Sequence, residues 1–275
     1  MAQTNILKRR LSAGDILFGA WVSGDSPANA EVLALQGFDF VIVDLEHGPG
    51  DIRLGLDVLR AVRPFGTPCV IRAPSNDPVF IKKILDVGAN ALMIPSVETA
   101  EEAEAAVRAC KYPPEGARGY AASLVRASDY GRDAAYMCTA NEEILLIVQI
   151  ESAAAVERAP EICAVAGVDV PFLGVNDMAG SIGRLEQLDK PDVRNLVSRA
   201  EAAMRASGKP FGGVPSAAAD WRRLVESGYR LIPAASDIGL LRDAASDCIR
   251  ERKQYVAERT KPAPPARRAT TPGLA

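Results

Sequence analysis

The chain has 275 residues, and its 32 basic and 35 acidic side chains leave a formal net charge of −3. That balance gives no sign of a nucleic-acid-binding surface. Apolar residues make up 48% of the chain, but no uninterrupted apolar run approaches the roughly 18 to 20 residues of a membrane span. We therefore expect a soluble protein with neither a nucleic-acid nor a membrane partner.

The first residues carry basic side chains but lack the apolar region and the small-residue cleavage site of a secretory signal. A cytoplasmic location is therefore expected. The 5 cysteines are odd in number, widely spaced and in mostly apolar settings, which is typical of buried free thiols rather than of disulfides. The single histidine, His47, excludes any zinc site that needs two histidines.

Nearly continuous apolar runs alternate with amphipathic stretches as far as about residue 257. Such runs are typical of strands in a parallel sheet that is covered on both faces. Eight of them are expected to be strands, at residues 18–22, 38–44, 68–72, 91–95, 144–150, 170–174, 210–215 and 229–234.

The stretches between these strands carry helix start signals. Capping residues are expected to open helices at Ser26, Asp51, Asp77, Thr99, Ser216 and Ser236. Residues 153–166 and 191–207 are also expected to be helical. The interval 111–143 is too long for a simple connection, so we expect it to contain a turn and a further helical piece.

Eight strand and helix repeats favour a single (β/α)₈ barrel domain, an architecture that takes about 250 residues, over residues 1–257. A doubly wound open sheet is the alternative. It usually has fewer strands, however, and no Gly-x-Gly-x-x-Gly turn follows an early strand. Residues 258–275 are rich in Pro, Ala and Arg, and we expect them to be disordered because they have too few apolar side chains to offset chain entropy.

The active face of such a barrel is formed by polar residues at the carboxyl ends of the strands. The residues expected there are Trp21, Asp44, Glu46, His47, Arg72, Gln149, Glu151, Asn176, Asp177, Ser236 and Asp237.

Two of these carboxylates, Glu151 and Asp177, follow neighbouring strands. With no thiolate cluster nearby, they suit an oxygen-ligated cation such as Mg²⁺, Mn²⁺ or Co²⁺. The alternative is that each carboxylate only caps the next helix.

Two basic side chains on the same face, Arg72 and His47, could each have either a catalytic role or none. Arg72 ends an apolar strand, where it could anchor a carboxylate or an enolate oxygen, or could form a structural ion pair with Asp44 or Glu46. His47 lies three residues beyond Asp44, which could orient the imidazole as a general base. A lone histidine can also have no role.

The positions of the lysines argue against one kind of aldolase chemistry. None of the eight lies at the carboxyl end of an expected strand. A Schiff-base aldolase, which needs a desolvated lysine in the active site, is therefore disfavoured.

Several longer motifs resemble a known family. They include FGAWVSGDSP, FDFVIVDLEHGPGD, VRASDYG, LLIVQIESAAAV and FLGVNDMAGSIG. Over roughly residues 5–250 the chain is similar to the HpcH/HpaI family of metal-dependent pyruvate aldolases.

This resemblance implies a (β/α)₈ barrel and a class II aldolase that acts on 4-hydroxy-2-oxo acids through a pyruvate enolate. The cofactor would be a divalent metal, with no nucleotide or pyridoxal phosphate, and the substrates would be a 2-oxo acid such as pyruvate and an aldehyde. The family commonly forms hexamers, as trimers of dimers that exchange the last helix.

Residue roles carry over by matching motifs. They are metal ligation by Glu151 and Asp177, enolate stabilisation by Arg72, proton transfer by His47 with Asp44, pyruvate binding by Gln149 and the amides of Asn176 and Asp177, and a wall at the acceptor aldehyde by Trp21.

One motif departs from the family pattern. The family usually has Gly-Pro-x-Asp before the second ligand, whereas this chain has Gly174, Val175, Asn176 and Asp177. Loss of the proline leaves this loop less rigid, so pyruvate placement or acceptor choice could differ.

The resemblance implies substrates of the 2-keto-3-deoxy sugar acid or 4-hydroxy-2-oxoheptanedioate type. Oxaloacetate decarboxylation, which passes through the same enolate, is the enzymatic alternative. A barrel that only binds oxo acids is the alternative without catalysis.

Overall fold

Eight parallel strands form a closed barrel in chain order in the computed structural model, which describes residues 4–216 and 218–260. The strands are β1 (Leu17–Val22), β2 (Phe40–Asp44), β3 (Cys69–Arg72), β4 (Ala91–Ile94), β5 (Leu145–Ile150), β6 (Val170–Leu173), β7 (Gly212–Gly213) and β8 (Leu231–Ser236). Strand β8 pairs with β1 and closes the ring. The expected (β/α)₈ barrel is confirmed, and closure excludes the open-sheet alternative.

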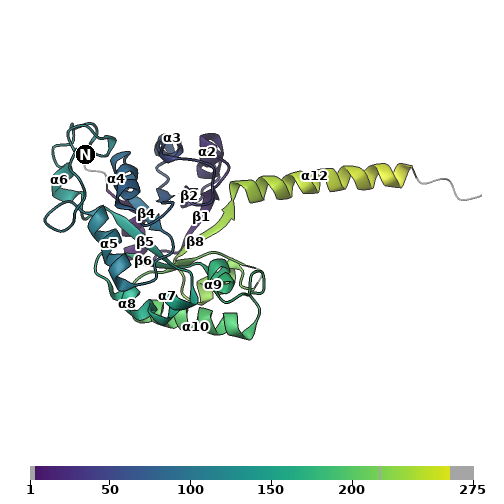
Figure 1. Cartoon of the computed structure of the whole chain (residues 1–275). Coiled ribbons are helices and arrows are strands. Elements are labelled where there is room, and N and C mark those ends of the chain that lie inside the picture. The colour runs from purple at the N-terminus through teal and green to yellow at the C-terminus, as the bar shows by residue number, and fades with distance from the viewer. Residues whose placement is uncertain (1–3, 217, 261–275) are drawn as a thin grey trace, which may run out of the picture. The chain divides into compact units, whose positions relative to one another are not determined.

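Within residues 1–238, helices lie around the strands of the barrel (Figure 1). The α-helices are α1 (Ile6–Ser12), α2 (Pro27–Leu35), α3 (Ile52–Val62), α4 (Pro78–Asp86), α5 (Ala100–Cys110), α6 (Tyr136–Thr139), α7 (Ala153–Glu157), α8 (Ala159–Ala164), α9 (Val175–Ser181), α10 (Pro191–Ala206), α11 (Trp221–Glu226) and α12 (Asp237–Arg259). Two short 3₁₀ helices, η1 (Arg63–Phe65) and η2 (Arg126–Ser128), accompany them.

Four expected capping residues occupy the N-cap positions of their helices. The side chains of Ser26, Asp51, Asp77 and Thr99 each accept a hydrogen bond from a backbone N–H in the first turn of α2, α3, α4 and α5. These bonds satisfy N–H groups that have no partner inside the helix.

Several helices differ from the expectation. Helix α11 is capped by Asp220, whereas Ser216 Oγ accepts from the N–H groups of Ala218 and Ala219 in a tight turn before the helix. The stretch 153–166 is divided into α7 and α8 near Arg158, because Pro160 has no N–H to continue the ladder of the first helix. Helices α1 and α9 were not expected at all.

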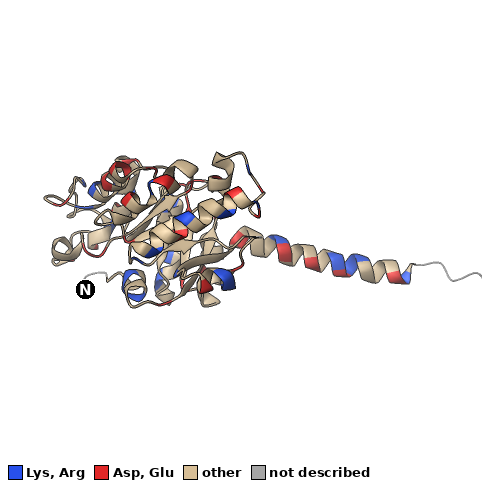
Figure 2. Ribbon diagram, turned by 90° about the horizontal axis from the view of Figure 1, so that it is seen from below, with Lys and Arg blue, Asp and Glu red and all other residues tan. Residues whose placement is uncertain are grey.

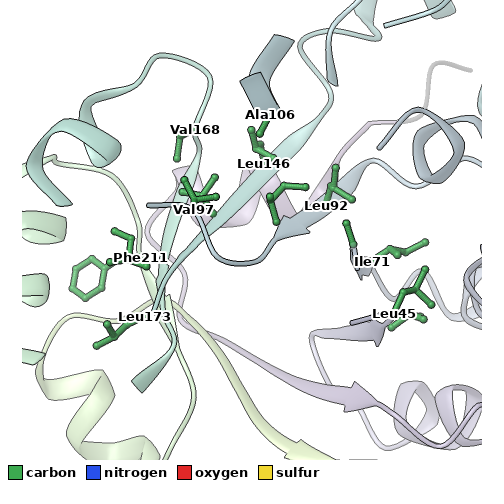
Figure 3. Packing of buried hydrophobic residues seen from close by; sticks show 14 of the residues in the cluster. Leu45, Ile71, Leu92, Val97, Ala106, Leu146, Val168, Leu173 and Phe211 are labelled. Atoms are coloured by element: carbon green, nitrogen blue, oxygen red, sulfur yellow. The ribbon is translucent and has the colours of Figure 1, made fainter. Parts of the chain in front are cut away.

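Alternate faces of the strands bury separate apolar layers. Side chains that point inward fill the barrel, and Leu7 and Leu11 of α1 pack into the same inner cluster. Side chains that point outward form a larger layer against the helices, part of which is shown in Figure 3 with Ile71, Leu92 and Leu146. This layer explains why the strand sequences are apolar on both faces.

The cysteines follow the expectation only in part. All five are free, and Cys69, Cys110 and Cys163 are buried. Cys138 and Cys248 are exposed, which corrects the prediction of five buried thiols. The two exposed residues lie in the long 111–143 segment and in α12, outside the strands and helices that build the core.

The backbone groups into two units, residues 1–238 with the barrel and residues 239–275 with most of α12. Helix α12 carries both basic and acidic side chains along its length (Figure 2). Residues 258 and 259 belong to α12, and residues 261–275 of the expected tail lie outside the described residues. Among the described helices, none has the length and apolar character needed to cross a membrane.

Candidate active site

An acidic and a basic side chain form an ion pair at the carboxyl ends of β2 and β3. Asp44 and Arg72 are the last residues of these strands and are direct neighbours in the sheet register. The guanidinium donates from Nε to Asp44 Oδ1 at 2.9 Å and from Nη2 to Oδ2 at 2.7 Å. This paired arrangement fixes the plane of the guanidinium.

Arg72 contacts three further side chains. Its Nη1 lies 3.0 Å from Glu46 Oε2 and 3.4 Å from Gln149 Oε1, and its Cζ lies 4.5 Å from the centre of the Trp21 ring. The ion pairs that sequence reasoning left as a structural alternative are therefore present. They do not decide whether Arg72 also binds substrate, because the cluster lies at the end of the barrel where active sites form.

The electrostatic state of Asp44 follows from this pairing. Burial by itself would raise the pKa of Asp44, but the hydrogen bond and the charge of Arg72 outweigh it and hold that pKa below its usual value. Asp44 Oδ1 also accepts from the backbone N–H groups of Glu46 and His47, at 3.1 and 3.2 Å. Asp44 is therefore a carboxylate that stabilises the folded barrel.

A stability prediction follows for Asp44→Asn. Because the folded-state pKa of Asp44 is lowered, its contribution is present above the unfolded-state value of about 3.9 and is lost as pH falls through the folded-state value. We expect the variant to lose about 3 to 5 kcal/mol of unfolding free energy near neutral pH and to lose less on acidification. Urea unfolding across a pH series measures both effects.

The matched control is Asp189→Asn at an exposed position. It should keep both the stability and the acid profile of the unaltered protein. A stable Asp44→Asn variant with an unchanged acid profile would contradict the assigned role of the Asp44–Arg72 pair.

The imidazole of His47 has a different neighbour from the one expected. Its Nε2 lies 3.9 Å from Glu46 Oε2, whereas Asp44 contacts only the backbone N–H of His47. The His47 side chain is 64% exposed, so substrate and water can reach it. Burial raises the pKa of Glu46, although the charge of Arg72 acts against this. Glu46 thus lies between the guanidinium and the imidazole.

Glu151 lies directly after β5 and is held by two neighbours. Its Oε1 accepts from Ser96 N at 2.7 Å and Ser96 Oγ at 3.0 Å, and its Oε2 accepts from Gln149 Nε2 at 2.6 Å. A Cβ at Gly174 would lie 2.5 Å from Glu151 Oε2, so this position needs glycine for the carboxylate to fit. Burial raises the pKa of Glu151, the Ser96 hydrogen bonds act against this, and the nearby charge of Asp177 adds to the rise.

Asp177 and Asn176 lie in the first turn of α9, directly after β6, and both are exposed. Val175, which replaces the proline of the family pattern, is the first residue of α9 and packs against the outer apolar layer. No side chain caps this helix. The charge of Asp177 contributes to the raised pKa of Glu151, after burial.

Comparison with known proteins assigns the chain to a family. The model of the HpcH/HpaI aldolase/citrate lyase family matches residues 17–244. The chain belongs to the HpcH/HpaI aldolase/citrate lyase family. It is therefore a carbon–carbon lyase, and the alternative of a barrel that only binds oxo acids is set aside.

Individual relatives agree with this assignment. The chain is 41% identical over 241 residues to a hydroxypyruvate/pyruvate aldolase of Delftia acidovorans, covering 88% of this chain and 90% of that protein. It is 40% identical over 240 residues to a 5-keto-4-deoxy-D-glucarate aldolase of Shigella boydii, covering 87% and 93%. A crystal structure of an HpcH/HpaI family protein from Burkholderia cenocepacia has a TM-score of 0.86 and 38% identity, covering 91% of this chain and all of that one.

Class II aldolases of the HpcH/HpaI family depend on a divalent metal, and the carboxylates of this chain fit one. Within the described residues no group of three or more His, Cys, Asp or Glu side chains is arranged to hold a metal ion. Burial raises the pKa of Glu151, and the charge of Asp177 adds to the rise. A divalent cation bound at the two carboxylates would favour their charged forms, and oxygen ligands suit Mg²⁺ or Mn²⁺.

Two side chains of the site were absent from the sequence-based assignment of roles in this HpcH/HpaI protein. Ser96 follows β4 and holds Glu151, and Glu46 contacts both Arg72 and His47. Both also line a cavity of about 470 Å³ between the loops after β3 and β4. The strand-end rule applied to β4 would have indicated Ser96.

Asp237, at the end of β8, has a structural function in this barrel. Its buried carboxylate accepts from the N–H groups of Ser23 and Gly24, from Asn29 Nδ2 and from the N–H of Ile238. All four of these bonds are to protein donors on either side of the β8–β1 seam. Asp237 therefore ties the last strand to the first loop.

Proposed function

We propose that this enzyme cleaves and forms 4-hydroxy-2-oxo acids through a pyruvate enolate, with a 2-keto-3-deoxy sugar acid or 4-hydroxy-2-oxoheptanedioate as the type of substrate. The observation that carries the proposal is that Arg72, Glu151 and the exposed imidazole of His47 lie at one end of the barrel. The relatives named for hydroxypyruvate/pyruvate and 5-keto-4-deoxy-D-glucarate support this substrate class.

We assign the metal to Glu151 and Asp177. When bound there, Mg²⁺, Mn²⁺ or Co²⁺ would act as a Lewis acid on the keto group of the substrate. The protein contributes the placement of both ligands. Ser96 and Gln149 hold the Glu151 carboxylate in one orientation, and the short α9 helix carries Asp177.

The chain's own residues can then divide the retro-aldol step between them. His47 takes the proton of the 4-hydroxyl, whose electron pair forms the aldehyde C=O as the bond between C3 and C4 breaks. The pair of that bond becomes the C2–C3 double bond and moves the π pair of the keto group onto its oxygen, which leaves the enolate of pyruvate. Arg72 donates hydrogen bonds to that oxygen as its charge develops. Protonation of the enolate at C3 gives pyruvate.

Glu46 and Asp44 have separate parts in this assignment. Glu46 Oε2 lies 3.9 Å from Nε2 of the imidazole, so Glu46 is assigned to orient the ring. Asp44 accepts hydrogen bonds from the backbone N–H of His47 and from the guanidinium of Arg72, so it is a positioning residue for both. The pyruvate pocket is assigned to Gln149 and to the N–H groups of Asn176 and Asp177, with Trp21 as a wall for the acceptor.

Oxaloacetate decarboxylation provides a direct test, because it forms the same enolate without loss of a hydroxyl proton. We expect the protein with Mg²⁺ or Mn²⁺ to release pyruvate from both oxaloacetate and a panel of 4-hydroxy-2-oxo acids. In His47→Ala the retro-aldol rate should fall by about 10²- to 10⁴-fold while decarboxylation is retained. A coupled pyruvate assay measures both.

The outcomes separate the two enzymatic alternatives. If only oxaloacetate is turned over, the protein is a decarboxylase and the aldolase proposal fails. If His47→Ala slows both reactions equally, the imidazole does not act on the hydroxyl proton. Arg72→Lys should slow both, since both reactions develop the same enolate.

We further propose a homo-oligomer of the family type, a hexamer of three dimers that exchange the last helix. Helix α12 carries exposed apolar side chains that would need a partner, among them Leu241 and Val256. The cytoplasmic location expected from the sequence stays a prediction.

A further inference from the structure

A second cavity lies at the end of the barrel opposite the candidate active site. Its lining comes from α1 and from the residues that begin or precede β5, β6, β7 and β8, whereas the active-site residues follow the strands. Its volume is about 760 Å³, within the range of about 300 to 1,000 Å³ that is usual for small-molecule sites. The proposed lyase reaction does not use it.

Four cations and one carboxylate line this cavity: Lys8, Arg205, Lys209, Arg230 and Asp169. Lys8 pairs with Asp169 at 3.1 Å. For the other three cations, no carboxylate of the described chain lies within ion-pair distance of 4.0 Å. The lining therefore has four basic side chains against one carboxylate, and Asp169, which pairs with Lys8, also attracts Lys209.

Two cations of α1 that lie outside the cavity are paired with carboxylates. Arg10 of α1 pairs with Asp15 at 2.8 Å and with Asp39 at 2.7 Å, and Arg9 pairs with Glu143 at 3.3 Å. The chain as a whole is acidic, with a net charge of −3, so carboxylates are available to pair with cations. Among the described residues, the three cations of the cavity differ from Arg9 and Arg10 in having no such partner.

Backbone carbonyls hold the three unpaired cations in place. Arg205 donates to Ser227 O at 2.9 Å, Lys209 Nζ donates to Val165 O at 2.8 Å, and Arg230 donates to Tyr229 O at 3.2 Å. A guanidinium has five N–H donors and an ammonium three, so most of the donors remain for a ligand. Fixed cations bind an anion at a lower entropy cost than mobile ones do.

We propose that this cavity binds a small oxyanion that carries two or more negative charges, of the dicarboxylate or the phosphate class. Two or more charges match the cations that have no carboxylate partner. The small size follows from the concave shape, and Leu11, Leu145 and Phe211 add apolar walls that a compact metabolite could contact. This site goes beyond the proposed lyase function and does not depend on it.

The test uses isothermal titration calorimetry on the metal-loaded protein at constant ionic strength, with glutarate and inorganic phosphate as separate probes. We expect saturable binding of one equivalent per chain by at least one probe, and the probe that binds identifies the class. The exposed Arg205 allows a mild change, Arg205→Gln, and Arg230→Met removes a second cation. Each should weaken binding by about tenfold or more, the cost of a charge-assisted hydrogen bond.

Two control variants make the result specific. Arg132→Met removes an exposed cation outside the cavity and should leave binding unchanged. Arg72→Lys alters the active site and should also leave it unchanged. The proposal is overturned if neither probe binds, or if Arg205→Gln and Arg230→Met keep full binding.

Discussion

Loss of metal-dependent turnover is the expected result of replacing Glu151 with Gln. The substitution keeps the shape of the side chain and removes the charge that pairs with the metal. We expect kcat to fall by more than about 10³-fold, because Lewis-acid stabilisation is worth several kcal/mol. Asp177→Asn should have a similar effect, and so should removal of the metal with EDTA. Steady-state pyruvate release with and without added Mg²⁺ or Mn²⁺ measures the fall in kcat.

Gly174→Ala tests the same site without changing either ligand. The added methyl group would lie 2.5 Å from Glu151 Oε2 and 2.6 Å from Glu151 Cβ, so the carboxylate must move. We expect weaker metal binding, seen as a higher metal concentration for half-maximal rate. Glu142→Gln, at an exposed position, is the matched control and should behave as the unaltered protein. Full turnover in metal-stripped protein would rule out the assignment.

Arg72→Lys is the second change with a large expected effect. Lysine keeps the charge but has one donor centre, whereas Arg72 uses Nε and Nη2 for Asp44 while Nη1 lies near Glu46 and Gln149. We expect kcat/KM to fall by about 10²- to 10³-fold, as for loss of one donor to a developing oxyanion. The loss should appear with both a 4-hydroxy-2-oxo acid and oxaloacetate.

Added guanidinium ion gives this prediction a sharper readout. If the variant fails because a donor is missing from the site, guanidinium should restore part of the activity. If it fails because the barrel is distorted, guanidinium should not help. Arg108→Lys, on the exposed face of α5, should leave kcat/KM unchanged. Unaltered kinetics in Arg72→Lys would exclude a role in the reaction.

The barrel could be predicted because its signals are local. A run such as residues 40–44 is buried along its whole length, and capping residues such as Asp51 and Thr99 act on N–H groups two or three residues away. The predicted N-cap of α11 was wrong because Ser216 and Asp220 are both residue types that suit an N-cap. In the structure Ser216 forms a tight turn with Ala219, so the helix begins later and Asp220 is its N-cap.

Residue types at strand ends could also be predicted, and so Asp44, Arg72 and Glu151 were found from the chain alone. Among their partners, the ion pairs of Arg72 with Asp44 and Glu46 were one of the alternatives, whereas the side chains that contact Glu151 and His47 were not predicted. Ser96 holds Glu151 across a separation of 55 residues, and Glu46 rather than Asp44 contacts the imidazole of His47. These contacts depend on rotamers and on the register between neighbouring strands.

The cavity at the opposite end of the barrel also could not be predicted from the sequence, although its residues could be read there. Lys8, Lys209 and Arg230 read as unrelated surface cations along the chain, and closure of the barrel places them around one hollow. Which residues form strands is a matter of short-range pattern, whereas which strand ends face one another depends on eight strands pairing in a ring. That ring brings residues together over nearly the whole length of the chain, and no local pattern records its register.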